Sequence, residues 1–312
     1  MWQIARNLLR KSVDRRRSFL VLHDIDGWAL DHVFEMWFAE CSDFRVVRRN
    51  WSCFSTARAF IGYDAVIFGY LDIYLRFCFD PKRSIVVIHD PCEIFPQIPD
   101  WKNTEPDRHK IDILKRLQGV IVISQEMEDI LRSHGVSVHR IPTMSRLPVL
   151  ESKISPDQPV RAISIYKEYP RKNSPCLKRL AENGRKLSAW DLLLYENPDY
   201  SDQEYIKMID LHPIYVCASW QEGGPLPAMD VMSRGGVVVT TPVGQIQEII
   251  THDESGFLCE NEEDFEHVLR RLFNDSEYLL QVRIKSLAAY RNFRDKHEIQ
   301  KSVSNTLLDI QI

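Results

Sequence analysis

The segment from Ile214 to Thr241 reads "IYVCASWQEGGPLPAMDVMSRGGVVVTT". Apolar runs of strand length stand at both ends, and a helix is expected after Pro225, because proline is tolerated in the first turn of a helix. A strand, a turn, a helix and a second strand in this order form the unit from which parallel sheets are built. The turn carries two glycines and two prolines, with acids at Glu222 and Asp230. The segment therefore predicts an α/β fold in which a ligand approaches a strand end.

The same alternation continues outward through most of the chain. Runs this apolar are typical of parallel strands covered by helices on both faces. The segment 145–160 has three prolines and no clear period, and we interpret it as an interdomain linker. Further strands are expected at 18–25, 43–49, 64–70, 84–90, 119–124, 160–166 and 190–196.

These patterns predict two Rossmann-like domains facing across a cleft. The expected order is a basic leader, a first domain, a linker, a smaller second domain, and a final helix that could pack back on the first domain. Two open α/β halves of this kind place a ligand at the carboxyl ends of their strands. The expected limits are 1–17, 18–147, 148–158, 159–290 and 291–312.

Composition excludes several classes of protein. The 312 residues are 44% hydrophobic and 27% charged, and the net charge of −4 argues against a nucleic-acid partner. No apolar stretch approaches the roughly 18 residues that span a bilayer, and no signal peptide is visible. The seven cysteines form no C-x-x-C pair, which favours buried thiols in a reducing cytoplasm and no structural zinc site.

The first 17 residues carry six cations and a single acid, with Trp2, Ile4, Leu8 and Leu9 among them. A basic amphipathic start of this kind can lie on an anionic membrane surface. The alternative is a solvated segment before the first strand. The first interpretation predicts a cytoplasmic protein attached peripherally to the inner face of a membrane.

The turn at Glu222 has the composition of a phosphate and hydroxyl site. Gly223 and Gly224 let a ligand approach bare backbone, and the helix after Pro225 offers free N–H groups and positive potential to a phosphate. Carboxylates would repel a phosphate, and are better suited to accepting hydrogen bonds from hydroxyls. A nucleotide sugar fits this description. The alternative is a loop acid at Glu222 and a helix surface acid at Asp230.

A basic turn follows the strand expected at 160–166. The sequence "YKEYPRKN" contains Lys167, Arg171 and Lys172. Cleavage of a sugar–phosphate bond builds negative charge on the departing diphosphate, and fixed cations stabilise that charge. The alternative is a solvated turn with three cations.

The forty residues from Ser219 to Leu258, "SWQEGGPLPAMDVMSRGGVVVTTPVGQIQEIITHDESGFL", resemble the signature of family 4 (group 1) glycosyltransferases of the GT-B fold. That family shows an E-G-F-G-x-P-x-x-E-A-M-A-x-G-x-P-V stretch, then a V-G-G-x-x-E segment and a turn ending in G-x-L. Weaker similarity extends over 18–275, for example in "VVIHD", "GVIVISQEMEDIL" and "HRIPTM". The resemblance implies a retaining, metal-independent glycosyltransferase that uses a nucleoside-diphosphate sugar as donor substrate and needs no cofactor.

The resemblance also implies a role for individual residues. Glu222 would contact the donor sugar, with Lys167 and Lys172 neutralising the diphosphate and His89 contacting the acceptor or the sugar. Asp230 stands where the family has a glutamate that binds the ribose hydroxyls, and it is one methylene shorter. A lysine, Lys167, stands where the family has an arginine, and so lacks the planar bidentate fork. The other residues expected to bind the donor are Ser219, Gly223, Gly224, Pro225, Leu226, Arg171, Gly244 and Glu248.

Three further sites have two interpretations each. His89 is either a cleft residue or a structural histidine, and Glu248 either lies near the nucleotide at a helix start or is a first-turn acid. The D-x-D of "HDID", His23 to Asp26, matches a metal signature of another glycosyltransferase fold, but its position favours a strand-to-helix turn with Gly27 near the acceptor. Between the strands expected at 160–166 and 214–219, the sequence has one strand–helix unit fewer than the family that it resembles.

The expected acceptor is a glycan, a lipid-linked saccharide or a small molecule, in surface polysaccharide or glycoconjugate biosynthesis. Two alternatives stay open. The chain could bind nucleotide sugar or glycan as an assembly module with weakened catalysis, or it could be a nucleotide-sugar epimerase on the same two-domain plan.

Overall fold

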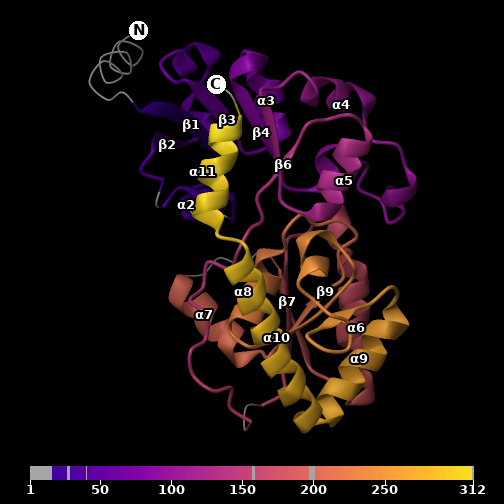
Figure 1. Ribbon diagram of the computed structural model, residues 1–312. Coiled ribbons are helices and arrows are strands. Elements are labelled where there is room, and N and C mark those ends of the chain that lie inside the picture. The colour runs from indigo at the N-terminus through magenta and orange to yellow at the C-terminus, as the bar shows by residue number, and fades with distance from the viewer. Residues whose placement is uncertain (1–15, 27–28, 40, 157–158, 197–200, 311–312) are drawn as a thin grey trace. The chain divides into compact units, whose positions relative to one another are not determined.

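The structure is a computed structural model that describes residues 16–26, 29–39, 41–156, 159–196 and 201–310. The chain divides into two compact units, each built on one parallel sheet (Figure 1). Unit 1 comprises the chain up to Pro96, then Lys102–Thr143 and the residues from His297 onward; unit 2 comprises Gln97–Trp101 and Met144–Lys296. The predicted α/β fold with two Rossmann-like domains is confirmed. Residues 1–15 of the predicted basic leader, and Gly27, lie outside the described residues.

Unit 1 contains a six-stranded sheet in the order β2-β1-β3-β4-β5-β6. All of its described pairings are parallel; Val21, for example, lies opposite Arg48 of β2 and Ile67 of β3. The central strands are buried along their whole length, which explains their unbroken apolar runs. The strands are β1 (Arg17–His23), β2 (Phe44–Asn50), β3 (Ala65–Phe68), β4 (Ser84–Ile88), β5 (Gly119–Val122) and β6 (His139–Arg140).

The helices of unit 1 follow its strands. Ser124 caps α5, because its hydroxyl accepts a hydrogen bond from the Met127 amide at 3.3 Å, and Gly135 ends the turn that follows with a φ of +75°. The α-helices are α2 (Ala29–Phe38), α3 (Leu71–Phe77), α4 (Arg108–Leu114), α5 (Gln125–Ser133) and α11 (Ile299–Asp309). Short 3₁₀ helices are η1 (Trp51–Cys53), η2 (Ala57–Phe60), η3 (Pro81–Arg83) and η4 (Pro91–Glu93).

The last helix, α11, belongs to unit 1 although the long helix before it belongs to unit 2. It packs on α2, where Gln300 Nε2 donates to the Met36 carbonyl at 3.4 Å. Ile310 sits so close to Gly119 that a Cβ added there would lie 2.7 Å from its Cδ1. The chain therefore ends by returning to the sheet on which it began.

Unit 2 contains a five-stranded sheet in the order β11-β10-β9-β7-β8, again with parallel pairings throughout its described strands. Its strands are β7 (Ala162–Tyr166), β8 (Leu192–Glu196), β9 (Ile214–Cys217), β10 (Val237–Thr240) and β11 (Phe257–Leu258). Its α-helices are α6 (Ser174–Leu187), α7 (Asp202–Leu211), α8 (Leu226–Ser233), α9 (Glu262–Asn274) and α10 (Ser276–Lys296), with 3₁₀ helices η6 (Pro170–Lys172) and η7 (Gly244–Glu248).

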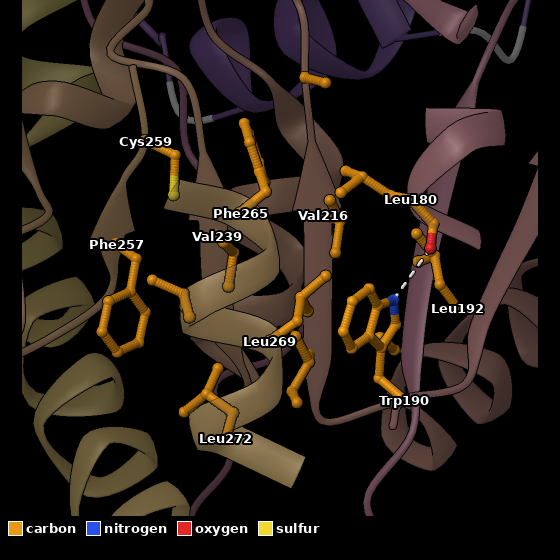
Figure 2. Packing of buried hydrophobic residues seen from close by; sticks show 14 of the residues in the cluster. Leu180, Trp190, Leu192, Val216, Val239, Phe257, Cys259, Phe265, Leu269 and Leu272 are labelled. Carbon is orange, nitrogen blue, oxygen red and sulfur yellow. Dashed lines mark hydrogen bonds between the residues drawn. The ribbon is translucent and has the colours of Figure 1, made fainter. Parts of the chain in front are cut away.

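One apolar cluster forms between the sheet of unit 2 and the helices α6 and α9 (Figure 2). Alternate strand residues such as Val216 and Val239 point into it, as the two-residue period of a strand requires. Trp190 closes one side, with its indole Nε1–H donating to the Leu180 carbonyl at 3.0 Å. This cluster makes the sheet a rigid base for the loops at its carboxyl edge.

Two features of the fold have no clear signal in the sequence. The strands β6 and β11 contain two residues each, which is too short for a hydrophobic period. Residues 97–101 belong to unit 2 although the chain on both sides of them belongs to unit 1. Among the described residues, no helix is both long and apolar enough to cross a bilayer.

Gly184 of α6 lies against Trp190, and this contact gives a test of the packing. A Cβ built on Gly184 would lie 2.4 Å from Trp190 Nε1 and 2.6 Å from its carbonyl oxygen. Gly184→Ala is therefore expected to lower the free energy of unfolding by about 1–3 kcal/mol, as overpacked cores usually do. Urea unfolding measures this change. Glu182→Ala on the same helix is the control, because it removes an exposed ion pair with Lys186 that contributes little; equal stability of the two variants would contradict the packing.

Candidate functional site

The predicted site residues other than His89 lie in unit 2, and Glu222, Arg171 and Lys172 meet at the carboxyl edge of its sheet. The strands β10, β9 and β7 are neighbours, and Thr240 pairs with Cys217 in register, so their ends lie side by side. The turn after β7 contains η6 with Arg171 and Lys172, and the turn after β9 contains Glu222. Parallel strands thus bring together two segments that are fifty residues apart in the chain.

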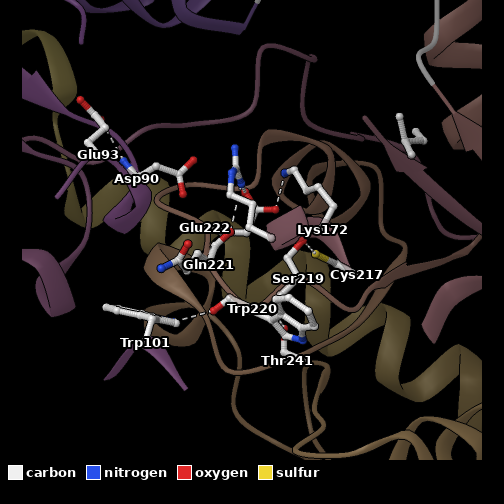
Figure 3. A network of polar contacts seen from close by, with 12 residues as sticks. Asp90, Glu93, Trp101, Lys172, Cys217, Ser219, Trp220, Gln221, Glu222 and Thr241 are labelled. Carbon is white, nitrogen blue, oxygen red and sulfur yellow. Dashed lines mark hydrogen bonds and ion pairs between the residues drawn. The ribbon is translucent and has the colours of Figure 1, made fainter. Parts of the chain in front are cut away.

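A buried ion-pair cluster forms the centre of the site. Glu222 is 5% exposed, and its side chain points toward Lys172 (Figure 3). Its Oε2 accepts a hydrogen bond from Arg171 Nη1 at 3.1 Å, and its Oε1 is paired with Lys172 Nζ. Two cations therefore share one carboxylate at a strand end.

The charge environment holds Glu222 in its ionised form. Burial by itself would raise the pKa of this carboxyl, but the charges of Lys172 and Arg171 and hydrogen bonds from Lys172 and Ser219 outweigh burial and bring the pKa well below its ordinary value. Ser219 is itself buried and accepts a hydrogen bond from the Cys217 thiol at 3.4 Å. The carboxylate is therefore ionised at neutral pH.

The loop that carries Glu222 packs against the turn after β10. Gly244 has a φ of +51°, and a Cβ there would lie 2.3 Å from the carbonyl oxygens of both Glu222 and Gly223. The Gln245 amide donates to the Gly223 carbonyl at 2.7 Å. A side chain at position 244 would displace the loop, so Gly244 supports the position of Glu222 through the backbone.

The helix α8 starts directly after this loop. Pro225 is its N-cap residue, Leu226 its first residue, and Pro227 lies in its first turn. Gly223 is buried and Gly224 half-buried, so the chain enters the helix without a side chain between Glu222 and Pro225. The helix N-terminus therefore follows the ion-pair cluster, as the sequence predicted.

Asp230 lies in the same helix but is turned into the protein. It is 1% exposed, and its two carboxylate oxygens accept hydrogen bonds from the Ser145 hydroxyl at 2.7 Å and the Tyr205 hydroxyl at 2.8 Å. Burial raises its pKa, although these hydrogen bonds oppose the rise. In this structure Asp230 joins α8 to α7 and to the segment that leads out of unit 1.

Lys167 and Glu248 lie on the turns that also carry Lys172 and Gly244. Lys167 directly follows β7 and is half-buried. Glu248 is exposed and ends the short helix η7, which corrects our expectation that it begins a helix. The helix starts four residues earlier because the left-handed Gly244 turns the chain directly after β10.

His89 belongs to unit 1, at the carboxyl end of β4. Its ring lies 5.3 Å from that of Tyr70, centroid to centroid, and burial lowers its pKa to about 3, which keeps the imidazole neutral. Its Nε2 is buried and has no hydrogen-bond partner among the residues that the structure describes. A neutral imidazole with an open nitrogen can accept or donate a hydrogen bond to a ligand hydroxyl.

Glu93 holds the turn after His89 and was not predicted from the sequence. Its Oε1 accepts hydrogen bonds from the amides of His89 at 2.7 Å and Asp90 at 3.2 Å, and its Oε2 accepts one from Leu71 at 2.8 Å. Burial raises its pKa to about 8 against these three hydrogen bonds. The sequence "DPCE" has the spacing of a capping box, which is the signal that could have identified it.

The "HDID" segment forms a separate group of polar residues in unit 1. His23 Nε2 lies 3.5 Å from Asp26 Oδ1 and 3.7 Å from Asp31 Oδ1, an arrangement that could hold a metal ion. Arg48 Nη1 already donates to the same Asp31 oxygen at 2.9 Å and supplies a positive charge there. The group lines a cavity of about 460 Å³ with Arg49.

Two family models match parts of this chain. Residues 177–289 match the family model described as Glycosyl transferases group 1, and residues 81–144 match the model described as Glucosyltransferase 3-like, N-terminal domain. The resemblance predicted from the sequence is therefore confirmed. Arg171 and Lys172 lie between the two matched segments, so their place in the site comes from the structure. A search of curated protein sequences found no match.

Solved structures of several glycosyltransferases are similar to this chain. A mutant of TarM from S. aureus, in complex with Fondaparinux, alpha-GlcNAc-glycerol and UDP, matches with a TM-score of 0.64 and 17% identity over 79% of this chain and 55% of its own. HepE from Anabaena, in complex with UDP and glucose, matches with a TM-score of 0.68 and 11% identity over 94% and 100%. Sucrose-phosphate synthase from Thermosynechococcus elongatus matches with a TM-score of 0.69 and 12% identity over 95% and 99%. The chain thus has the GT-B fold, and it spans just over half the length of TarM.

The ion-pair cluster predicts how stability depends on pH. Because the folded-state pKa of Glu222 is depressed, its contribution to stability is complete above the ordinary value of 4.5 and is lost as the pH falls below it. Glu222→Gln is expected to flatten the fall of melting temperature on acidification from pH 6 to pH 3. Glu254→Gln, on an exposed turn, is the control and should keep the wild-type slope. A wild-type slope in Glu222→Gln would show that the ion pair does not form in solution.

Proposed function

We propose that this chain is a glycosyltransferase that moves a sugar from a nucleoside-diphosphate sugar to a hydroxyl of an acceptor, with retention of configuration and without a metal. The observation that carries this proposal is the Glu222 carboxylate, buried at a strand end between Arg171 and Lys172. The match to group 1 glycosyltransferases and the UDP bound to TarM and HepE support the same class of donor.

The charges of the site suit a diphosphate leaving group. In the proposed reaction the bond from the anomeric carbon to the diphosphate oxygen breaks and a bond from the anomeric carbon to the acceptor oxygen forms. Negative charge grows on the departing diphosphate, which can take the proton that the acceptor hydroxyl loses. Arg171 and Lys172 outnumber the carboxylate they share, so the site has positive charge in excess. Fixed cations in a buried site stabilise such a leaving group without reorganisation, and they can take the role that a metal has elsewhere.

Glu222 would have two successive partners. Without donor, it neutralises Arg171 and Lys172 and so keeps both cations in place at the strand end. When a diphosphate competes for the cations, the carboxylate oxygens become free to accept hydrogen bonds from the sugar hydroxyls. The same exchange would couple phosphate binding to sugar recognition.

Unit 1 would bind the acceptor. The neutral His89 imidazole, positioned by the hydrogen bonds of Glu93 to the backbone, is the candidate group for a hydroxyl of a glycan or a lipid-linked saccharide. TarM and HepE were crystallised with carbohydrate ligands, which supports an acceptor of this class. We propose a role in surface polysaccharide or glycoconjugate synthesis on this basis.

Turnover tests the proposal. Transfer or hydrolysis of a panel of nucleoside-diphosphate sugars, starting with UDP-sugars, is expected to require both Glu222 and Lys172. Glu222→Ala and Lys172→Ala should each lower kcat/KM at least about tenfold, which corresponds to about 1.4 kcal/mol of transition-state stabilisation. Lys186→Ala, an exposed cation on α6, should keep the wild-type rate.

Two results would contradict the proposal. Near-wild-type rates in both site variants would separate the ion-pair cluster from catalysis. Calorimetric binding of nucleoside diphosphates without turnover on any donor and acceptor pair would indicate a binding module and would leave the enzyme without support.

We further propose that the basic start of the chain binds an anionic membrane surface. Its six cations and four large apolar residues in 17 positions support this proposal by composition. Deleting residues 1–15, which leaves β1 intact, is expected to reduce co-sedimentation with vesicles that contain anionic lipid. Neutral vesicles are the control, and an unchanged bound fraction on anionic vesicles would refute the proposal.

A further inference from the structure

The backbone of the loop around Glu222 is held by hydrogen-bond donors from three segments of the chain. The carbonyl groups of four of its residues accept hydrogen bonds from the turn after β10, from the turn that contains η6, and from the segment 97–101. The pairs are Thr241 Oγ1 to Ser219, Trp101 Nε1 to Trp220, Arg171 Nη1 to Gln221, and the Gln245 amide to Gly223.

Trp101 differs from the other three donors in its origin. It belongs to the segment 97–101, which lies in unit 2 while the chain on both sides of it lies in unit 1. Residues 97–100 are exposed, whereas the Trp101 side chain is 1% exposed. The segment is therefore anchored in unit 2 by its indole, and the indole Nε1–H lies 2.7 Å from the Trp220 carbonyl oxygen (Figure 3).

We propose that Trp101 is a positioning residue for the loop that carries Glu222, a role that rests on the proposed function of that loop. The Trp220 carbonyl and the Gln221 amide belong to one planar peptide, so a hydrogen bond to the carbonyl fixes the direction in which the chain enters Gln221 and Glu222. Trp101 thereby keeps the Glu222 carboxylate facing Arg171 and Lys172.

Neighbouring hydrogen bonds make this position sensitive to the loss of one donor. The Trp220 amide donates to the Arg171 carbonyl at 2.7 Å, and the Arg171 side chain donates back to the Gln221 carbonyl at 3.0 Å. These two bonds join the loop to the turn that contains η6. The Trp101 indole binds the loop separately, at the Trp220 carbonyl. Without Trp101, the Trp220 carbonyl would lack this donor and the peptide could rotate toward another.

The chain offers a matched pair of variants. Trp101→Phe removes the indole N–H that holds the loop and keeps an aromatic ring. Trp190→Phe removes an indole N–H of the same kind, bound to the Leu180 carbonyl at 3.0 Å in the apolar cluster of unit 2. Both replace a buried tryptophan by phenylalanine, so they differ in which carbonyl loses its donor.

Native-state hydrogen exchange by mass spectrometry, on the full chain without ligand, reads the loop directly. Trp101→Phe is expected to speed amide exchange in the peptide spanning 218–224 by about fivefold, the equivalent of one lost hydrogen bond, and to weaken binding of a nucleoside diphosphate by a similar factor. Trp190→Phe is expected to lower the melting temperature and to leave exchange in 218–224 as in the wild type.

Two outcomes would overturn the proposal. Wild-type exchange at 218–224 in Trp101→Phe would show that the indole does not hold the loop, and equal acceleration in Trp190→Phe would show a general loss of stability. The exchange experiment contains no ligand, so it is independent of the proposed function. Failure of the wild-type chain to bind any nucleoside diphosphate would instead contradict the proposed function itself.

Discussion

The central constraint in this molecule is the burial of one carboxylate beside two cations. A buried charge without partners would cost several kcal/mol, so Glu222 requires Arg171 and Lys172 to be in place. The cations lie on a turn after β7 and the carboxylate on a turn after β9, so the ion pair forms only when these strands are neighbours in the sheet. The order of strands and the charge of the site therefore depend on each other.

The two acids of this segment, Glu222 and Asp230, have different partners and therefore do not form an acid–base pair. Glu222 is paired on both oxygens with the cations Arg171 and Lys172, whereas Asp230 in the next helix is bound on both oxygens by the hydroxyls of Ser145 and Tyr205. The first acid joins two charged turns and the second holds α8 to its surroundings. An aspartate suits that structural role, because its short side chain keeps the carboxylate close to the helix backbone.

Each unit contributes a different kind of polar group. The second unit has fixed charges set on 3₁₀ turns and loops above a packed apolar base. The first has a neutral histidine whose backbone is held by the carboxyl group of Glu93, which accepts three amide hydrogen bonds. Charge suits a diphosphate and a neutral imidazole suits a hydroxyl, which is consistent with a donor and an acceptor bound by different parts of one chain.

The sequence by itself determined the class of fold, the principal strands and the segment around Glu222. Apolar runs, glycines and prolines act locally, and their spacing along the chain is sufficient to predict a strand, a turn or a helix start. Only the tertiary structure decided which partners the two acids have, that Glu248 ends a helix, and that Trp101 reaches the Trp220 carbonyl. These features depend on contacts between residues up to 119 positions apart, and such contacts leave no periodic signal in the sequence. Their positions follow from the order of the strands and from side chains that compete for the same buried hydrogen-bonding groups.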